Sequence, residues 1–207
     1  MQDDWLQRIR DHHPEVLKSE RLFPEAAVLV PITRGEQPEL VLTLRASGLS
    51  THGGEVAFPG GRRDPEDEGL AQTALREAHE EIGLPPGLVE VIGPLSTLVS
   101  KHGIKVTPYV AVIPDYVEYK PNDGEIAAVF TVPLTFFLDH PRETTHRIDH
   151  MGKHWYVPCY RYEGFKIWGL TAMVVVELMN VMFDAGIALN EPVQAFEIPS
   201  REGANER

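Results

Sequence analysis

Hydrophobic positions along the chain follow two different periods, and the changes between them divide the sequence into expected strands and helices. Short apolar runs rich in β-branched residues and bounded by turn residues predict strands. These runs lie at 26–32, 40–44, 55–58, 89–98, 105–113 and 125–131, with a hairpin at 154–162 and 165–168. Apolar residues three and four apart predict helices at 3–13, 134–138 and 169–185.

One further helix is predicted between the acidic segment 64–68 and Gly83. Its narrow apolar stripe consists of Ala71, Ala74, Leu75, Ala78 and Ile82. The acidic segment offers side chains that cap a helix start and suit its dipole. Gly83 stands where a left-handed C-terminal cap is expected. We therefore expect a helix with one buried face and a polar face opposite to it.

Three carboxylates crowd this helix, because Glu77, Glu80 and Glu81 lie three and four positions apart and share a face. Like charges so placed destabilise a helix unless a cation lies between them. Hard divalent cations such as Mg²⁺ prefer carboxylate oxygens. A solvated glutamate-rich surface is the alternative, but it explains neither the neighbouring Arg76 nor the glycine pair at 60–61 that follows a strand.

The order of elements predicts an α/β fold with a mixed sheet between helices. The 207 residues are most simply one domain with extensions. We expect an N-terminal helical extension at 1–24, a catalytic domain at 25–188 and a polar C-terminal tail at 189–207.

Composition narrows the classes of partner and the compartment. The formal charge of −12, from 31 acidic and 19 basic residues, argues against binding to nucleic acid. The lone cysteine, Cys159, excludes an internal disulfide and suits a reducing cytoplasm. No secretory signal is visible at the start of the sequence. The most apolar stretch, 170–183, is too short to span a bilayer, so no membrane partner is expected.

From Gly61 to Leu84 the sequence resembles the Nudix box, in which a glycine, a glutamate and an Arg-Glu-x2-Glu-Glu-x-Gly unit follow one another. The spacing between the glutamate and the arginine is one residue longer here. Either Asp67 takes the place of that glutamate, or Glu68 does after an insertion. On this motif the chain is identified as a member of the Nudix hydrolase family, and the resemblance implies an α/β/α sandwich with a mixed sheet.

The resemblance also implies a mechanism. Glu77, Glu80, Glu81 and the carbonyl of Gly61 would hold Mg²⁺ or Mn²⁺, which neutralises a substrate diphosphate and acidifies bound water. Glu80 is a candidate for the general base, and Glu81 is placed with it among the catalytic groups. Arg76 is expected to orient the glutamates through charge-assisted hydrogen bonds.

Glu125 lies outside the box, in a turn that leads into an expected strand. In the family a downstream acid near this place binds metal or acts as the base. The alternative is a solvated turn residue. The identity of the base and the number of metals stay open at this point.

Segments outside the box resemble the coenzyme A pyrophosphatase branch of the family. They lie at 42–46, 54–61, 106–108, 125–130 and 168–172. The expected activity is hydrolysis of coenzyme A or acyl-coenzyme A to 3′,5′-ADP and a 4′-phosphopantetheine species. Arg45, Phe58 and Ser50 are expected at the substrate, although Ser50 stands where the branch has an arginine. Such a change bears on recognition of the 3′-phosphate.

Other interpretations are kept beside this one. A different small-molecule nucleotide, such as ADP-ribose or a dinucleotide, is the first alternative substrate. A non-catalytic nucleotide-binding module is the second alternative. His146, His150 and His154 have the spacing of helical zinc ligands, but Gly152 interrupts them and a polar loop is expected there. The sequence leaves acyl-chain preference and oligomeric state open, with a homodimer as one option.

Overall fold

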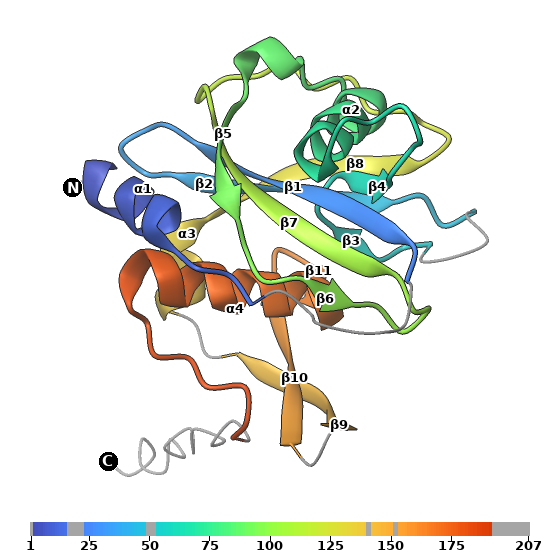
Figure 1. The fold of residues 1–207 in the computed structure, drawn as a ribbon. Helices are drawn as coiled ribbons and strands as arrows, with labels where there is room; N and C mark the ends of the chain where they lie inside the picture. The colour runs from blue at the N-terminus through green and yellow to red at the C-terminus, as the bar shows by residue number, and fades with distance from the viewer. Residues whose placement is uncertain (1, 16–22, 49–52, 140–141, 151–152, 192–207) are drawn as a thin grey trace, which may run out of the picture.

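A mixed sheet forms the centre of the computed structural model, which describes residues 2–15, 23–48, 53–139, 142–150 and 153–191 (Figure 1). Its strands follow the order β3 (Val56–Ala57), β2 (Glu39–Arg45), β1 (Glu25–Thr33), β7 (Lys105–Ile113) and β5 (Glu90–Pro94). At its margins β4 (Gly60–Arg62) pairs with β1, β6 (Leu98–Val99) with β7, and β8 (Ile126–Pro133) with β2. β1 and β7 run parallel, and the other paired strands run antiparallel.

Helices cover both faces of this sheet. On one face α2 (Leu70–Ile82) buries Ala74, Ala78 and Ile82 against Ala27 and Leu29 of β1. The other face carries α1 (Gln2–Asp11) and α4 (Gly169–Phe183), which pack on the alternate positions of the same strands. Because successive side chains of a strand point to opposite faces, one strand supplies both cores. The predicted α/β/α sandwich is confirmed.

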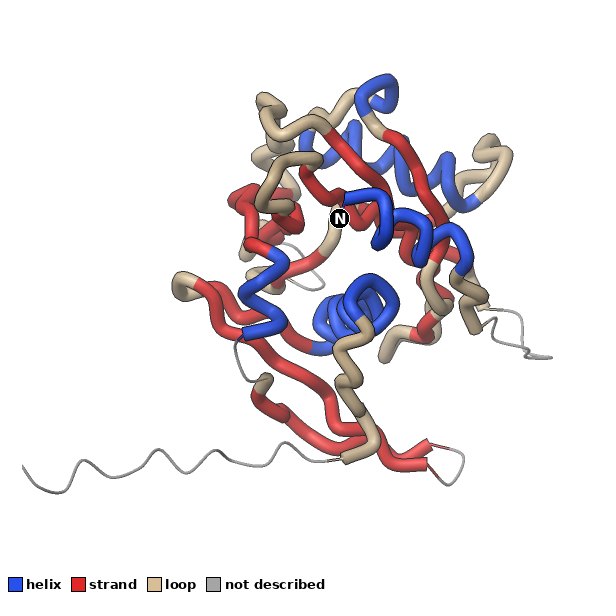
Figure 2. The backbone as a smooth tube through the Cα atoms, turned by 90° about the vertical axis from the view of Figure 1, so that its left-hand side faces the viewer, coloured by secondary structure: helices blue, strands red, loops and turns tan. Residues whose placement is uncertain are grey.

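A smaller sheet lies beyond α4. It consists of β9 (Glu143–His150), β10 (Lys153–Tyr162) and β11 (Phe165–Trp168) in the order β11-β10-β9. Figure 2 shows α4 between this sheet and the main one. The predicted turn between β10 and β11 is present, with Glu163 at φ 47° and Gly164 at φ 87°. The short helices η1 (Pro86–Leu88) and α3 (Leu134–Asp139) complete the fold.

Several predicted elements need correction. The polar loop expected around His146 is wrong, because residues 143–150 form β9. The strand expected at 89–98 is divided into β5 and β6. Between them the backbone N–H of Ser96 donates to Glu177 Oε1 at 2.9 Å and so is not available to a neighbouring strand. The acidic cap expected for α2 is also wrong: its N-cap is Gly69, which makes no side-chain cap hydrogen bond. The left-handed C-cap at Gly83 is confirmed, with φ 67°.

The N-terminal segment packs on the domain and shares its core. Trp5 and Ile9 of α1 are 6% and 1% exposed and belong to the same buried cluster as α4. At the end of α1, His12 Nε2 lies 3.0 Å from Glu177 Oε1. The expected polar tail lies partly outside the described residues. None of the helices in the described part of the chain has the length and hydrophobicity needed to cross a membrane.

Candidate metal and catalytic site

Two consecutive glycines begin β4 against α2, and the strand that they form stands where the sequence indicated a turn. Gly60 and Gly61 in β4 pair with Val28 and Ala27 of β1. A Cβ on Gly60 would lie 2.4 Å from the carbonyl oxygen of Ala27. A Cβ on Gly61 would lie 2.4 Å from the carboxyl carbon of Glu77. The contact at Gly60 is with the backbone of β1 and excludes a larger residue, whereas a side chain at Gly61 would displace the carboxylate of Glu77.

Glu81 is the most deeply buried of the three predicted carboxylates, with 3% exposure. Its Oε2 accepts the backbone N–H of Gly60 at 3.0 Å, and its Oε1 accepts Nη1 of Arg45 at 3.1 Å. Burial raises the pKa of Glu81 to about 7, against the opposing effects of Gly60 and Arg45. The expected solvent-facing position is therefore wrong for Glu81, which belongs to the buried side of α2.

Arg76 holds the other two carboxylates of the helix. Its Nη1 donates to Glu77 Oε1 at 3.0 Å and to Glu80 Oε2 at 3.2 Å. The side chain of Glu77 is 17% exposed and that of Glu80 is 55% exposed. Burial raises the pKa of Glu77, Arg76 opposes this, and the charges of Glu80 and Glu125 add to it. Arg76 therefore hydrogen-bonds both glutamates, and the orienting role expected for it stays a prediction.

Asp67 supports Arg76 from the opposite side. Its oxygens accept Nε and Nη2 of Arg76, each at 3.1 Å, and the hydroxyl of Thr73 at 2.8 Å. The backbone N–H of Asp64 also donates to it at 2.9 Å. These hydrogen bonds, with that from Arg76 the largest, hold the pKa of Asp67 well below its usual range. Of the two alternatives left open by the motif, Asp67 fills this place, whereas the side chain of Glu68 is exposed.

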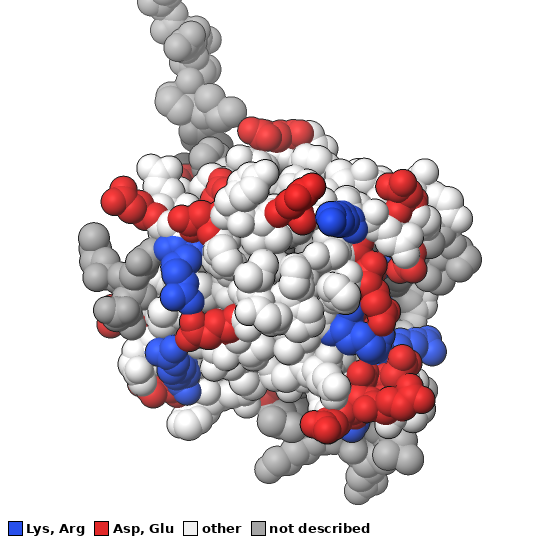
Figure 3. Space-filling view, turned by 90° about the horizontal axis from the view of Figure 1, so that it is seen from above, with Lys and Arg blue, Asp and Glu red and all other residues white. Residues whose placement is uncertain are grey.

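Glu125 comes to the same site from the start of β8. It is half-buried, and its Oε1 accepts Nδ2 of Asn122 at 3.3 Å. Its carbonyl accepts the backbone N–H of Ala46, next to Arg45. The negative charge of Glu125 adds slightly to the rise in the pKa of Glu77. Figure 3 views the molecule from above, where acidic side chains gather with a few basic ones at one margin.

Some predicted site residues lie elsewhere. Phe58 is 4% exposed and belongs to the hydrophobic core, so its side chain fixes the chain just before the glycine pair of β4. Ser50 lies outside the described residues. His154 on β10 bonds Asp149 through Nδ1, and the register places it on the other face of the hairpin from His146. The zinc alternative therefore gains no support from the strand geometry.

The residues present fit a hard divalent cation. Within the described ranges no three acidic, histidine or cysteine side chains already converge as a ligand set. Instead, Arg76 and Arg45 bind the carboxylates in separate groups. Carboxylate oxygens beside a backbone with no side chain form a donor set that suits Mg²⁺ or Mn²⁺. Burial of Glu81 without full charge compensation adds a reason for a cation here.

Comparisons with known proteins identify relatives of this chain. Residues 23–154 match the family described as NUDIX domain. The chain is 42% identical over 176 residues to the "Uncharacterized Nudix hydrolase NudL" of Enterobacter sp. (strain 638), covering 85% of this chain and 92% of the relative. For the protein of the same name from Shigella sonnei (strain Ss046), identity is 41% over 189 residues, with 86% and 93% covered.

A solved structure supports the fold alone. It is described as a MutT/nudix family protein from Enterococcus faecalis, and its sequence is 15% identical to this chain. The superposition has a TM-score of 0.52 and covers 81% of this chain and 65% of the other.

Proposed function

Because the chain belongs to the Nudix family of hydrolases, we propose that it cleaves the diphosphate bond of coenzyme A or an acyl-coenzyme A in the presence of Mg²⁺ or Mn²⁺. The enzyme class is that of a Nudix diphosphatase, which acts on nucleoside diphosphate derivatives. The expected products are 3′,5′-ADP and a 4′-phosphopantetheine species.

One observation carries the hydrolytic part of this proposal. Glu81 is buried beside Glu77 on α2, and both carboxylates lie against the glycine pair of β4, Gly60 and Gly61. Burying a carboxylate costs free energy unless a positive charge or hydrogen bonds compensate its own charge. Glu77, Glu80, Glu81 and the carbonyl of Gly61 would hold the metal. When bound, the metal would neutralise diphosphate charge and lower the pKa of a water molecule.

The protein's own residues prepare this site. Arg45 and the N–H of Gly60 fix both oxygens of Glu81, so this side chain keeps one orientation. Arg76 fixes Glu77 and draws Glu80 toward it. Glu80 remains the candidate to accept a proton from water, because its side chain is the most exposed of the three. Glu125 is the second candidate for this role.

The segments that resemble the coenzyme A branch adjoin this site, which supports the proposed substrate. Arg45 belongs to the segment 42–46 and binds Glu81 directly. The hydroxyl of Thr171, in another segment, donates at 3.0 Å to the carbonyl of Val56 in β3, the strand before the glycine pair. The aromatic rings of Phe130 and Phe165 stack on each other, with ring centroids 3.8 Å apart. From the positions of these residues we propose that the substrate is recognised beside the carboxylates of α2.

Product analysis tests the proposal. The purified chain is incubated in Mg²⁺ or Mn²⁺ with coenzyme A, dephospho-coenzyme A, ADP-ribose, NADH and a dinucleoside polyphosphate. We expect the highest kcat/KM for coenzyme A, with 3′,5′-ADP among the products. A higher value for ADP-ribose or a dinucleotide would replace the substrate but keep the enzyme class. Nucleotide binding without turnover in either metal would replace the enzyme by a binding module.

A further inference from the structure

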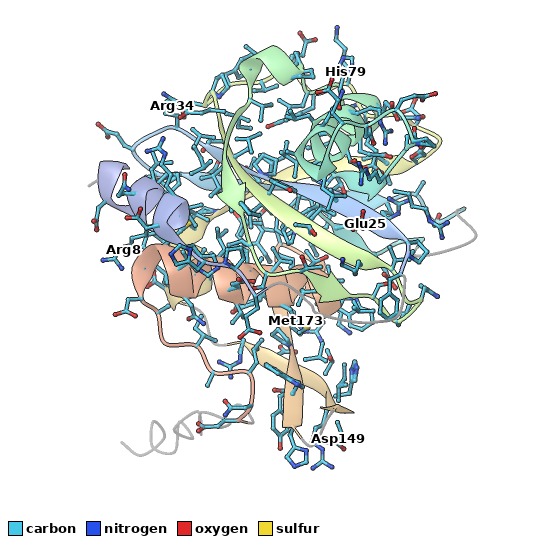
Figure 4. The ribbon with its side chains drawn as sticks, viewed as in Figure 1. Arg8, Glu25, Arg34, His79, Asp149 and Met173 are labelled. Carbon is cyan, nitrogen blue, oxygen red and sulfur yellow. The ribbon has the colours of Figure 1, made fainter. Side chains whose placement is uncertain are left out.

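β9 is an edge strand with an open side. In the described part of the chain it pairs with β10 alone. Side chains 145–149 are all exposed, including Ile148 at 43%. Figure 1 shows the β9–β10 hairpin projecting away from the main sheet, and Figure 4 labels Asp149 at its outer end. An edge of this kind presents unpaired backbone groups to another strand.

The two faces of this hairpin differ in chemistry. The register places Ile148 beside Trp155 on one face. On the other face Arg147 Nη2 lies 3.0 Å from Asp149 Oδ2, and His154 also bonds Asp149. An apolar cross-strand pair therefore lies on the face that also carries His146, and charged side chains alternate along the other face.

A second copy of the chain fits this edge in one register. An antiparallel twofold pairing keeps each side chain on its own face only when the axis passes through a residue. With the axis at Ile148, this residue meets the partner's Ile148, and Arg147 meets the partner's Asp149 on both sides of the axis. Opposite charges in directly opposed cross-strand positions stabilise a sheet, and like charges destabilise it.

The neighbouring registers are less favourable. An axis at Arg147 would oppose two arginines. An axis at His146 would oppose Asp149 to the partner's Glu143. An axis at Thr145 would oppose Ile148 to the partner's Arg142, which would place a charged side chain beside each Ile148.

We propose that two copies of this chain associate through antiparallel β9 strands centred on Ile148. The small sheets of both copies then form one continuous sheet. On one face an apolar row runs from Trp155 through the two Ile148 side chains to the partner's Trp155. On the other face each Asp149 lies between two arginines. This interface is independent of the proposed substrate, since it lies beyond α4 from the carboxylates of α2.

Charge exchange between copies tests the interface. Sedimentation equilibrium of the full chain should show a reversible dimer. Arg147→Asp and Asp149→Arg should each weaken self-association at least tenfold, because each opposes two like charges across the axis. An equimolar mixture of the two variants should restore a dimer, since every cross-strand pair is again of opposite sign. Lys166→Asp on β11 makes the same charge change at the other edge and should leave the dimer intact.

Cysteine crosslinking tests the register. Ile148→Cys should form an intermolecular disulfide on mild oxidation, because this position meets its own copy, whereas the native Cys159 is buried. Thr145→Cys is the matched exposed control and should stay reduced. A monomer at high micromolar concentration, a mixture that fails to dimerise, or crosslinking by Thr145→Cys in place of Ile148→Cys would each overturn the proposal.

Discussion

At the scale of single residues, Arg76 joins the two halves of the site. Asp67 binds it from the loop before α2, and Glu77 and Glu80 bind it from the helix. This guanidinium has no freedom to turn while Asp67 holds Nε and Nη2 together. Asp67 acts on the carboxylates through Arg76 and is therefore a positioning residue.

Replacing Asp67 by asparagine should lower stability in a pH-dependent way. The folded-state pKa of Asp67 lies below its ordinary value, so its stabilisation is fully present above about pH 4 and is lost as the pH falls. The difference in urea midpoint between wild type and Asp67→Asn should thus be largest near pH 7 and shrink toward pH 3. Glu68→Gln, at an exposed neighbour, should have little effect. Equal midpoints for wild type and Asp67→Asn at pH 7 would contradict this role.

Gly61→Ala should impair catalysis more than folding. The added Cβ would occupy the place of the Glu77 carboxylate, which can swing away because it ends a flexible side chain. A displacement near 1 Å at a reacting site costs up to about 10²-fold in rate, so we expect a loss of that order in kcat. Circular dichroism should show an unchanged fold. Gly87→Ala is the control, since its Cβ would meet no atom within 4 Å.

At the scale of elements, the helices and long strands could be predicted because their patterns are local. The stripe of α2 and its C-cap at Gly83 depend on residues within one helix. β9 could not be predicted, since both of its faces carry polar residues. The break between β5 and β6 depends on Glu177, which lies 81 residues from Ser96 in the sequence.

The candidate site shows the same division. The carboxylates of α2 and the glycine pair of β4 could be identified from their spacing in the sequence. The burial of Glu81 on α2 could not, because its charge is paired with Arg45, which lies 36 residues earlier on β2. A carboxylate in a polar helical pattern is read as exposed unless its distant cation is known.

Ile9→Ala tests whether α1 is part of the domain. Ile9 is 1% exposed in the core shared with α4, and such truncations cost about 2–5 kcal/mol. Chemical denaturation should show this loss. Arg8→Ala, whose ion pair with Asp4 is largely exposed, should change the free energy of unfolding by less than about 1 kcal/mol. Similar values for the two variants would mean that α1 does not depend on its buried face.

At the scale of the whole molecule, the formal charge is −12, and α2 alone carries Glu77, Glu80 and Glu81. Bringing these carboxylates together costs free energy that a bound cation would recover. A ligand that binds only the folded state stabilises it in proportion to the logarithm of its concentration.

Mg²⁺ should therefore raise the Tm of the wild type, and EDTA should reverse this effect. At about one hundred times the dissociation constant the gain is about 2.7 kcal/mol. Glu77→Gln and Glu81→Gln should each reduce the shift, because each removes a proposed ligand. Glu118→Gln removes the same charge at an exposed site and should keep the shift. Equal Mg²⁺ responses in all four proteins, measured by differential scanning fluorimetry, would argue against the site.

The contact of α1 with α4 affects how the protein folds during its synthesis. His12 and Glu177 are 165 residues apart in the chain, so α1 leaves the ribosome long before α4, the helix against which it docks. The parallel pairing of β1 with β7 likewise waits for residue 105 and beyond. Contacts so distant in sequence give a high contact order and slow folding. During synthesis the apolar face of α1 has no partner, and chaperones that bind nascent chains meet it before the rest of the core exists.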